Sequence, residues 1–388
     1  MMGGTFQEVF LDSFRSLFSG RVPLAALLIG APLGFTLLFG TIYKENVVNY
    51  IPLAVYDEDQ SSLSRQFIQS YRDSDRFTVT DYVSTEEEMR QTLLEGRALA
   101  VLEIPRDFSR DIHLGRGSDA MLMVNSANNM FGNAALSASQ EIARSFSLAV
   151  SANLLEAGGL LPAAAWNNAY PVRLGVRITG NPANGYTSFM LSGLMLNGLQ
   201  IGVMVTLAPL LITELLRRRY GKKYLSWLLI MAGTLPYWLT AMAGYLLSLF
   251  VVIGLFAVPM RGSWLDAMIL GGSFLFFVCG VLLLFSACVP SRELSLQAPM
   301  VYIMPGLLYS GLSWPVFDMN SVAAAFGRML PMTYAGDALR DIMLSGYAPE
   351  LAGNIIIMTG GGLLCALLAG MVFHWRRLRS WRKEGAET

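Results

Sequence analysis

The chain has 388 residues, of which 54% are hydrophobic and only 14% are charged. A soluble domain of average composition has about 45–50% apolar and about 25% charged residues, so this balance excludes an ordinary water-soluble globule. The formal net charge of +0 also excludes nucleic acid as a partner, because phosphate binding needs a concentrated basic surface.

The N-terminal residues 1–22 predict a cytoplasmic amphipathic helix. Apolar side chains recur there at three- and four-residue spacing, which is the period of one helix face, at Phe6, Val9, Phe10, Phe14, Leu17 and Phe18. Such a helix lies along the inner membrane surface. Two interpretations remain open: a simple membrane anchor, or a connecting helix that touches a cytoplasmic partner.

An uncharged apolar run at 23–43 follows, and it is long enough to cross the roughly 30 Å hydrocarbon core as the first transmembrane helix. Residues 44–185 then have an ordinary soluble composition, and apolar segments crowd the rest of the chain. Five further spans are predicted at about 186–213, 229–258, 266–289, 296–314 and 352–375. The chain is therefore expected to span the membrane repeatedly and to carry one large inserted domain.

The 44–185 insert is predicted to be a small α/β domain. Strands are expected at 53–56, at 77–79, at 99–104 and at 120–124, and their alternation with helical patterns indicates a largely parallel sheet. The intervening helices carry cap signals at Asp59 and Ser61, at Ser84 and Glu87, and at Gly96. A longer helix over 132–155 and an alternating strand at Val172, Leu174, Val176 and Ile178 complete the expected insert.

Basic residues set the expected orientation. They cluster before the first span, after the second, and in the tail 376–388 that follows the last, and the positive-inside rule places all three clusters in the cytoplasm. Both termini are then cytoplasmic, whereas the insert and the 315–350 connection face outward. The predicted fold class is mixed: a six-helix transmembrane domain with an inserted α/β extracytoplasmic domain.

Polar side chains inside the predicted spans are candidates for a substrate path. Asn197 and Gln200 are three residues apart, so they share one face of the second span, where contact with lipid would cost several kcal/mol. In and just beyond the fifth span the candidates are Tyr302, Tyr309, Ser310 and Ser313. Both sets are compatible with hydrogen bonding between helices or with contact to a transported molecule. The Pro305-Gly306 pair should interrupt the fifth span.

Catalytic signatures are missing from the sequence. The two histidines, His113 and His374, are predicted on opposite sides of the membrane, and no Gly-x-x-x-x-Gly-Lys-Ser/Thr phosphate loop is present. The three cysteines lie in apolar stretches and are expected to pack as small side chains. We therefore expect no cofactor and no metal in this chain, and any ATP use must belong to another polypeptide.

Several segments of the sequence resemble the membrane subunit of ABC-2-type exporters. In the C-terminal half these are Phe256–Gly262 (FAVPMRG), Pro305–Pro315 (PGLLYSGLSWP), Leu330–Tyr334 (LPMTY) and Asp337–Arg340 (DALR) with Met343. The insert adds Ile51–Asp57 (IPLAVYD), Ser62 with Ser64 and Arg65, and Ile104–Ser109 (IPRDFS), which resemble the subgroup with a large extracytoplasmic domain. Asn181-Pro182 and Phe189–Gly193 (FMLSG) extend the resemblance into the second span.

The resemblance implies a permease without catalytic activity in the bacterial inner membrane. It would pair with a second permease, identical or homologous, and with two cytoplasmic ABC ATPase subunits that bind ATP and Mg. The family meets its ATPase through the segment after the second span, so coupling is implied for Glu214, Arg217, Arg218, Arg219, Gly221 and Lys222. Unlike the family pattern, no Thr follows Gly221 here.

The expected task is export of an amphipathic or hydrophobic small molecule, drug-like or lipid-like, along a path between the two permeases. Membrane lipid is a further expected contact, and docking of a periplasmic adaptor on the outer domain is left open. The alternative function is a non-transporting receptor or scaffold whose outer domain binds a ligand or an envelope protein. A neighbouring reading frame for a P-loop ATPase would favour transport.

Overall fold

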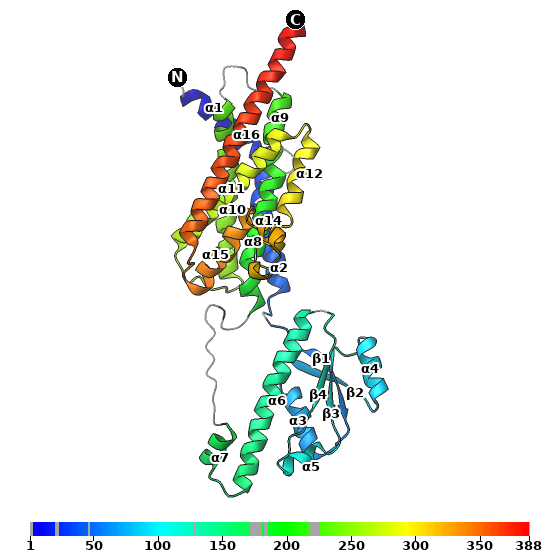
Figure 1. The fold of residues 1–388 in the computed structure, drawn as a ribbon. Coiled ribbons are helices and arrows are strands. Elements are labelled where there is room, and N and C mark those ends of the chain that lie inside the picture. Colours follow the sequence, from blue (N-terminus) through cyan, green and yellow to red (C-terminus); the bar gives the residue numbers. More distant parts are fainter. Residues whose placement is uncertain are drawn as a thin grey trace. The chain divides into compact units, whose positions relative to one another are not determined.

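The structure is a computed structural model, shown in Figure 1, and it describes residues 3–19, 23–45, 47–127, 129–170, 181, 185–217 and 226–387. Two compact units are present. The helical unit comprises Met1–Asn46 and Ile178–Thr388, and the α/β unit comprises Val47–Arg177. The strand predicted at 172–178 lies outside the described residues.

In the described part of the helical unit, five helices are long and apolar enough to cross a membrane. They begin close to the starts of five of the six predicted spans, because each contains a mainly apolar run of the required length. The last of them does not end near 375 as predicted, but continues through the basic tail 376–388 as far as Glu387. These helices are α2 (Leu24–Ile42), α8 (Tyr186–Leu207) with its extension α9 (Leu210–Arg217), α10 (Ser226–Gly254), α11 (Trp264–Cys288) and α16 (Leu351–Glu387).

The remaining predicted span, 296–314, is not a continuous helix. It consists of α12 (Arg292–Ile303) and the four-residue α13 (Gly306–Tyr309), separated at Met304 and Pro305. The expected interruption at the Pro305-Gly306 pair is thus confirmed. At about 1.5 Å per residue, α12 is about 18 Å long, which is too short to cross the hydrocarbon core alone.

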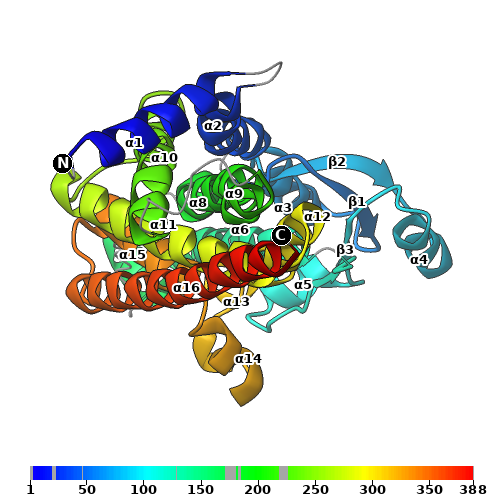
Figure 2. The ribbon, with the colours of Figure 1, turned by 90° about the horizontal axis from the view of Figure 1, so that it is seen from above.

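Helix α8 is the central element of the helical unit. It contacts α2, α10, α11 and α15. In its most apolar 18-residue segment 78% of the residues are buried, compared with 22–61% in the other four candidate spans. Figure 2 shows α8 with α2, α10 and α11 arranged around it.

Glycines allow α2 to approach α8 closely. A Cβ atom at Gly198 would lie 2.7 Å from Phe35 Cβ, and one at Gly202 would lie 3.0 Å from Ala31 Cβ. The corresponding pair on α2, Gly30 and Gly34, has open space at both positions. Of the two Gly-x-x-x-Gly motifs, only the one on α8 therefore serves helix packing.

The predicted 315–350 connection contains the 3₁₀ turn η1 (Val316–Asp318) and the helices α14 (Ser321–Gly327) and α15 (Pro331–Ser345). Helix α15 packs against α8 and α11. Its residues Met332, Leu339 and Met343 are fully buried. This part of the chain is thus a component of the helical core, although α15 is too short to be recognised as a span.

Helix α1 (Gly3–Phe18) has two apolar surfaces. It lies against α10 and α2 and buries Val9 and Leu17. The four phenylalanines of the predicted apolar face are not buried in this way but form a row of neighbouring rings. Three of them, Phe6, Phe14 and Phe18, are at least 36% exposed.

The α/β unit contains a four-stranded sheet in the order β2-β1-β3-β4. Strand β1 is parallel to β2 and to β3, whereas β4 is antiparallel to β3, as the largely parallel prediction requires. The strands are β1 (Ile51–Asp57), β2 (Phe77–Tyr82), β3 (Ala100–Ile104) and β4 (Met121–Val124).

Helices cover both faces of this sheet, as Figure 1 shows. One apolar core joins the sheet to α3 (Ser62–Arg72), α5 (Phe108–His113) and α6 (Asn129–Ala157). A smaller core lies under α4 (Glu86–Leu94) on the opposite face. A short helix, α7 (Pro162–Ala169), follows α6.

The cap predictions for this unit are confirmed in part. Ser61 caps α3 by accepting a hydrogen bond from Ser64 N, and Gly96 has the left-handed φ of 71° expected after α4. The predicted capping box at Ser84 and Glu87 is wrong by one residue. Thr85 caps α4, and the Glu88 carboxylate accepts from Ser84 N.

Candidate functional site

The break between α12 and α13 lies beside a polar pair on α8. Gln200 Nε2 donates to Asn197 Oδ1 at 2.8 Å and to the Ile303 carbonyl at 3.4 Å. A Cβ atom at Gly306 would lie only 3.3 Å from Gln200 Nε2, so glycine lets the break approach the amide. Interrupted backbone in a membrane helix needs partners of this kind. The arrangement favours hydrogen bonding between helices as the role of Gln200.

The two tyrosine candidates are both close to α14. Tyr302 donates a hydrogen bond to the Met329 carbonyl, and its ring meets Phe326 with centroids 6.4 Å apart. Tyr309 contacts the same Phe326 edge to face at 5.3 Å. The structure therefore brings Tyr302 and Tyr309 together through α14, separately from the Asn197 and Gln200 pair.

The two serine candidates differ in exposure. Ser310 is 1% exposed, and its Oγ donates to the Leu307 carbonyl at 3.0 Å. Ser313 Oγ bonds the same carbonyl at 3.1 Å, but the residue is exposed. Within the single chain, Ser310 lines no open surface. Ser313 is available to a second molecule or to a transported one.

Leu312 makes a contact that no pattern in the sequence indicates. Gly311, at φ 94°, turns the chain after α13, and the Leu312 side chain then enters a notch between two glycines. A Cβ atom would lie 2.7 Å from Leu312 Cδ1 at Gly193 on α8 and 2.5 Å from it at Gly336 on α15. Leu312 thereby joins α8, α15 and the segment after the helix break.

A second unanticipated contact joins α15 to the start of α8. Arg340 NH2 donates to Asp337 Oδ1 at 2.8 Å, and the guanidinium carbon lies 4.8 Å from the centre of the Phe189 ring. Arg340 NH1 is buried without a hydrogen-bond partner among the described residues. The three-residue spacing of the two opposite charges was the signal in the sequence for this ion pair.

The residues implied in ATPase coupling are described only in part. Glu214 and Arg217 belong to α9, of which the structure describes the backbone, whereas Arg218, Arg219, Gly221 and Lys222 lie outside the described residues. Helix α9 follows α8 after the turn at Ala208-Pro209.

The start of α9 is fixed by α11. Ser286 Oγ accepts hydrogen bonds from Leu211 N at 3.1 Å and from Ile212 N at 3.3 Å. These are amide groups at a helix start, which need an external acceptor. Helix α9 is thus anchored to the helical core at its beginning.

In the described ranges, no group of three or more His, Cys, Asp or Glu side chains could hold a metal ion. Near the break, the side chains of Tyr302, Ser310 and Ser313 donate to backbone carbonyls, and Gln200 donates to Asn197 and to a carbonyl. What they provide is a polar zone at the break between α12 and α13, in a bundle of apolar helices.

Comparison with known proteins defines the class. The model of the family described as "ABC-2 family transporter protein" matches residues 24–371, so the chain belongs to this family. It is 24% identical over 310 residues to the probable multidrug ABC transporter permease YbhR of Escherichia coli strain K12, covering 78% of this chain and 80% of that protein.

Two shorter similarities agree with this membership. The probable multidrug ABC transporter permease YbhS of Escherichia coli strain K12 is 25% identical over 41% of this chain and 40% of its own length. ABC transporter G family member 20 of Dictyostelium discoideum is 32% identical over 25% of this chain and 13% of its own length. The chain is thus a multi-pass membrane permease of an ABC transporter, a class that works with ABC ATPase subunits.

Proposed function

We propose that this permease exports an amphipathic or hydrophobic small molecule, driven by a partner ATPase, along a path between two permease chains. The observation that carries the proposal is the broken helix α12–α13, with Gln200 of α8 hydrogen-bonded to its Ile303 carbonyl. Non-helical backbone at membrane depth is tolerated beside protein or a cavity and marks transport paths in other membrane proteins. The relatives named as multidrug permeases support a drug-like substrate.

The exposed face of α12 and α13 is the proposed wall of the path. The apolar side chains Val301, Met304 and Leu308 are 79%, 48% and 61% exposed. Tyr309 at the end of α13 is half-buried, and Ser313 in the bend after α13 is exposed. A second permease, identical or homologous, would face this surface. A mainly apolar wall with few polar groups suits a substrate of mixed polarity.

Site-directed blocking tests the path. A Ser313→Cys protein, in a background without the native cysteines, is co-expressed with its ATPase and treated with a bulky maleimide during export of a hydrophobic dye. Export should fall to background while ATP binding persists. Met371→Cys on α16, which is 55% exposed, is the matched control and should export normally after labelling. Full export by the labelled Ser313→Cys protein would place the path elsewhere.

For the topology, we propose that both termini are cytoplasmic and that the α/β unit is extracytoplasmic. The basic residues near the N-terminus, after α9 and at the end of α16 support this orientation. Single cysteines at Ser118 and Lys222 should then react with an impermeant reagent from opposite sides of the membrane. Labelling of both from the same side contradicts this orientation.

We propose the segment from Glu214 to Lys222 as the contact with the ATPase. Its support is the anchored start of α9, because a rigid helix can pass movement from the cytoplasmic side into α8. The exposed row of phenylalanines on α1 is a second proposed contact.

Charge reversal at Arg217, Arg218 and Arg219 tests the coupling once correct insertion has been verified by the labelling assay. The reversed protein should lose co-purification with the ATPase or the substrate-stimulated ATP hydrolysis. Reversal of Arg382 and Lys383 in the C-terminal tail is the control. If correctly inserted reversal proteins keep both properties, the coupling assignment is wrong.

A further inference from the structure

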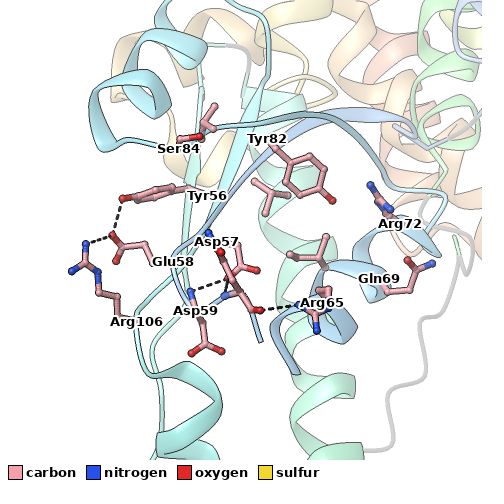
Figure 3. Close-up of a pocket in the computed structure, with 14 residues that line it drawn as sticks. Tyr56, Asp57, Glu58, Asp59, Arg65, Gln69, Arg72, Tyr82, Ser84 and Arg106 are labelled. Carbon is pink, nitrogen blue, oxygen red and sulfur yellow. Dashed lines mark hydrogen bonds and ion pairs between the residues drawn. The ribbon is translucent and has the colours of Figure 1, made fainter. Parts of the chain in front are cut away.

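An open groove with a volume of about 950 Å³ lies in the α/β unit. One wall is the outer face of α3, and the other is formed by the turn after β1 and by the end of β2 (Figure 3). Val55, Ile68 and Val83 form its apolar floor, and most of the remaining lining is polar. Nothing in the transport proposal requires a groove at this position.

The groove begins where ligands bind in many α/β proteins. Asp57 ends β1 and Tyr82 ends β2, and Arg106 follows β3 by two residues. These are the carboxyl ends of three parallel strands. In open α/β sheets, the crevice outside the carboxyl ends of the strands is the usual place for a ligand.

The acidic side chains in the groove are already engaged by protein donors. Asp57 accepts hydrogen bonds from two backbone amides and from Ser64 Oγ at 2.7 Å. Glu58 accepts from Tyr56 OH at 2.7 Å and from Arg106 at 3.4 Å. The Tyr56 hydrogen bond lowers the pKa of Glu58 and keeps this carboxylate ionised. Asp59 accepts from Ser109 N at 3.2 Å.

Two arginines on α3 have unused hydrogen-bond donors. Arg65 NH1 donates to the Gln60 carbonyl at 2.8 Å, and the Arg72 guanidinium carbon lies 5.6 Å from the centre of the Tyr82 ring. In the described part of the chain, neither arginine forms an ion pair with a carboxylate. Each guanidinium has five N–H donors, so most of this capacity is open to a ligand.

The two arginines share one face of α3. They are seven positions apart, which is close to two helical turns and about 10 Å along the axis. Figure 3 shows Arg72 beside Tyr82, Arg65 further along the helix, and the Glu58 and Arg106 pair on the opposite side. The groove therefore offers two positively charged side chains and, at one end, the aromatic residue Tyr82, which is 51% exposed.

We propose that this groove is a binding site for an elongated anionic small molecule that carries phosphate or carboxylate groups. One acidic group pairs with Arg65 and another with Arg72, because guanidinium groups bind these oxyanions through charge-assisted hydrogen bonds. The body of the ligand lies along the apolar floor and against Tyr82. The site would give the permease a ligand that is recognised outside the helical unit.

Calorimetric titration of the full chain in zwitterionic phosphatidylcholine nanodiscs tests this site, with inorganic tripolyphosphate as the probe and sucrose as an uncharged comparison. Tripolyphosphate should bind and sucrose should not. Arg65→Gln and Arg72→Gln should each weaken binding by about tenfold, the value of one charge-assisted hydrogen bond. Arg90→Gln, at an exposed arginine of α4 that does not line the groove, should leave the affinity unchanged.

A second titration, with an anionic lipid in the nanodisc, identifies the source of the anion. If phosphatidylglycerol in the nanodisc competes with tripolyphosphate, the ligand is an anionic headgroup, and without competition it is a soluble anion. Circular dichroism establishes that each variant is folded, and Arg72→Lys, which retains the charge, should recover part of the binding. The site is disproved if tripolyphosphate does not bind at millimolar concentration, or if Arg90→Gln weakens binding as much as Arg65→Gln and Arg72→Gln do.

Discussion

Leu312 fills a notch between two glycines, and this fit predicts that the effect of Gly336→Ala on stability changes sign when Leu312 is shortened. The three atoms nearest to a Cβ at Gly336 are Leu312 Cδ1, Cγ and Cδ2, at 2.5, 3.0 and 3.4 Å. A carbon–carbon contact of 2.5 Å cannot exist and one of 3.0 Å is tight, so Gly336→Ala must displace the leucine. Overpacking of this kind costs about 1–3 kcal/mol.

The opposing contribution is helix propensity, because alanine is about 1 kcal/mol more favourable than glycine inside a helix such as α15. Gly336→Ala alone should therefore destabilise the chain by up to about 2 kcal/mol. Leu312→Ala alone should cost about 2 kcal/mol. This value is at the low end for a buried leucine. Because lipid tails are as apolar as the leucine side chain, the mutation loses mainly packing contacts and little hydrophobic free energy.

In the Leu312→Ala background these three leucine atoms are absent, and the 2.5 Å clash is removed. Gly336→Ala should then stabilise the chain by up to about 1 kcal/mol, through propensity and partial filling of the cavity. The same cycle applies to Gly193, where Leu312 Cδ1 lies 2.7 Å from the added Cβ.

Unfolding of the purified chain in mixed micelles with increasing dodecyl sulfate, followed by circular dichroism, measures the four free energies of the cycle. Gly360→Ala on α16 is the matched control, because nothing lies within 4 Å of its added Cβ. This control should show the propensity gain in both backgrounds. If Gly336→Ala has the same effect in the native chain and in the Leu312→Ala background, the two positions are not coupled and the proposed fit is wrong.

Three further results follow from the packing and the charges. Gly198→Leu should abolish the monodisperse peak in size-exclusion chromatography, because α2 lies 2.7 Å from the added Cβ, whereas Gly30→Leu, with open space, should not. Gln200→Leu should lower the unfolding free energy by about 1–2 kcal/mol, since two buried acceptors lose their donor, and an unchanged value would contradict this role. The pKa of Glu58 in the folded chain is below its ordinary 4.5, so its contribution to stability is present above that pH and is lost as the pH falls below it. Tyr56→Phe should reduce this loss of stability in acid, measured by denaturation at a series of pH values. An unaltered pH dependence would refute the contact.

Local physical chemistry made much of the fold predictable from the sequence. The lengths of the uncharged runs located α2, α8, α10, α11 and α16, because a spanning helix needs about 20 apolar residues. Short apolar runs between helical patterns located the four strands of the sheet. The interruption between α12 and α13 was predictable because Pro305 lacks an N–H group and its ring clashes with a preceding carbonyl.

The pairing of distant segments was decided only by the tertiary structure. Asn197 and Gln200 were identifiable as polar residues on an apolar helix, but the Ile303 carbonyl became the partner of Gln200 because α8 and α12 are adjacent. The adjacency of α8 and α2 made Gly198 a packing residue, whereas Gly30 has open space around it. Packing against α8 and α11 buried α15, which is too short to be recognised from its sequence as a span.

The groove of the α/β unit depends on the fold in the same way. Arg65 belongs to a segment that resembles the family and Arg72 to no motif, but neither position indicated a groove in the sequence, and Tyr82 is ten residues beyond Arg72. They come together because the crossover through α3 returns the chain to a strand beside β1. Sequence patterns report the environment of each residue along its own helix or strand, whereas contacts between elements depend on how the chain packs, and no local pattern records that.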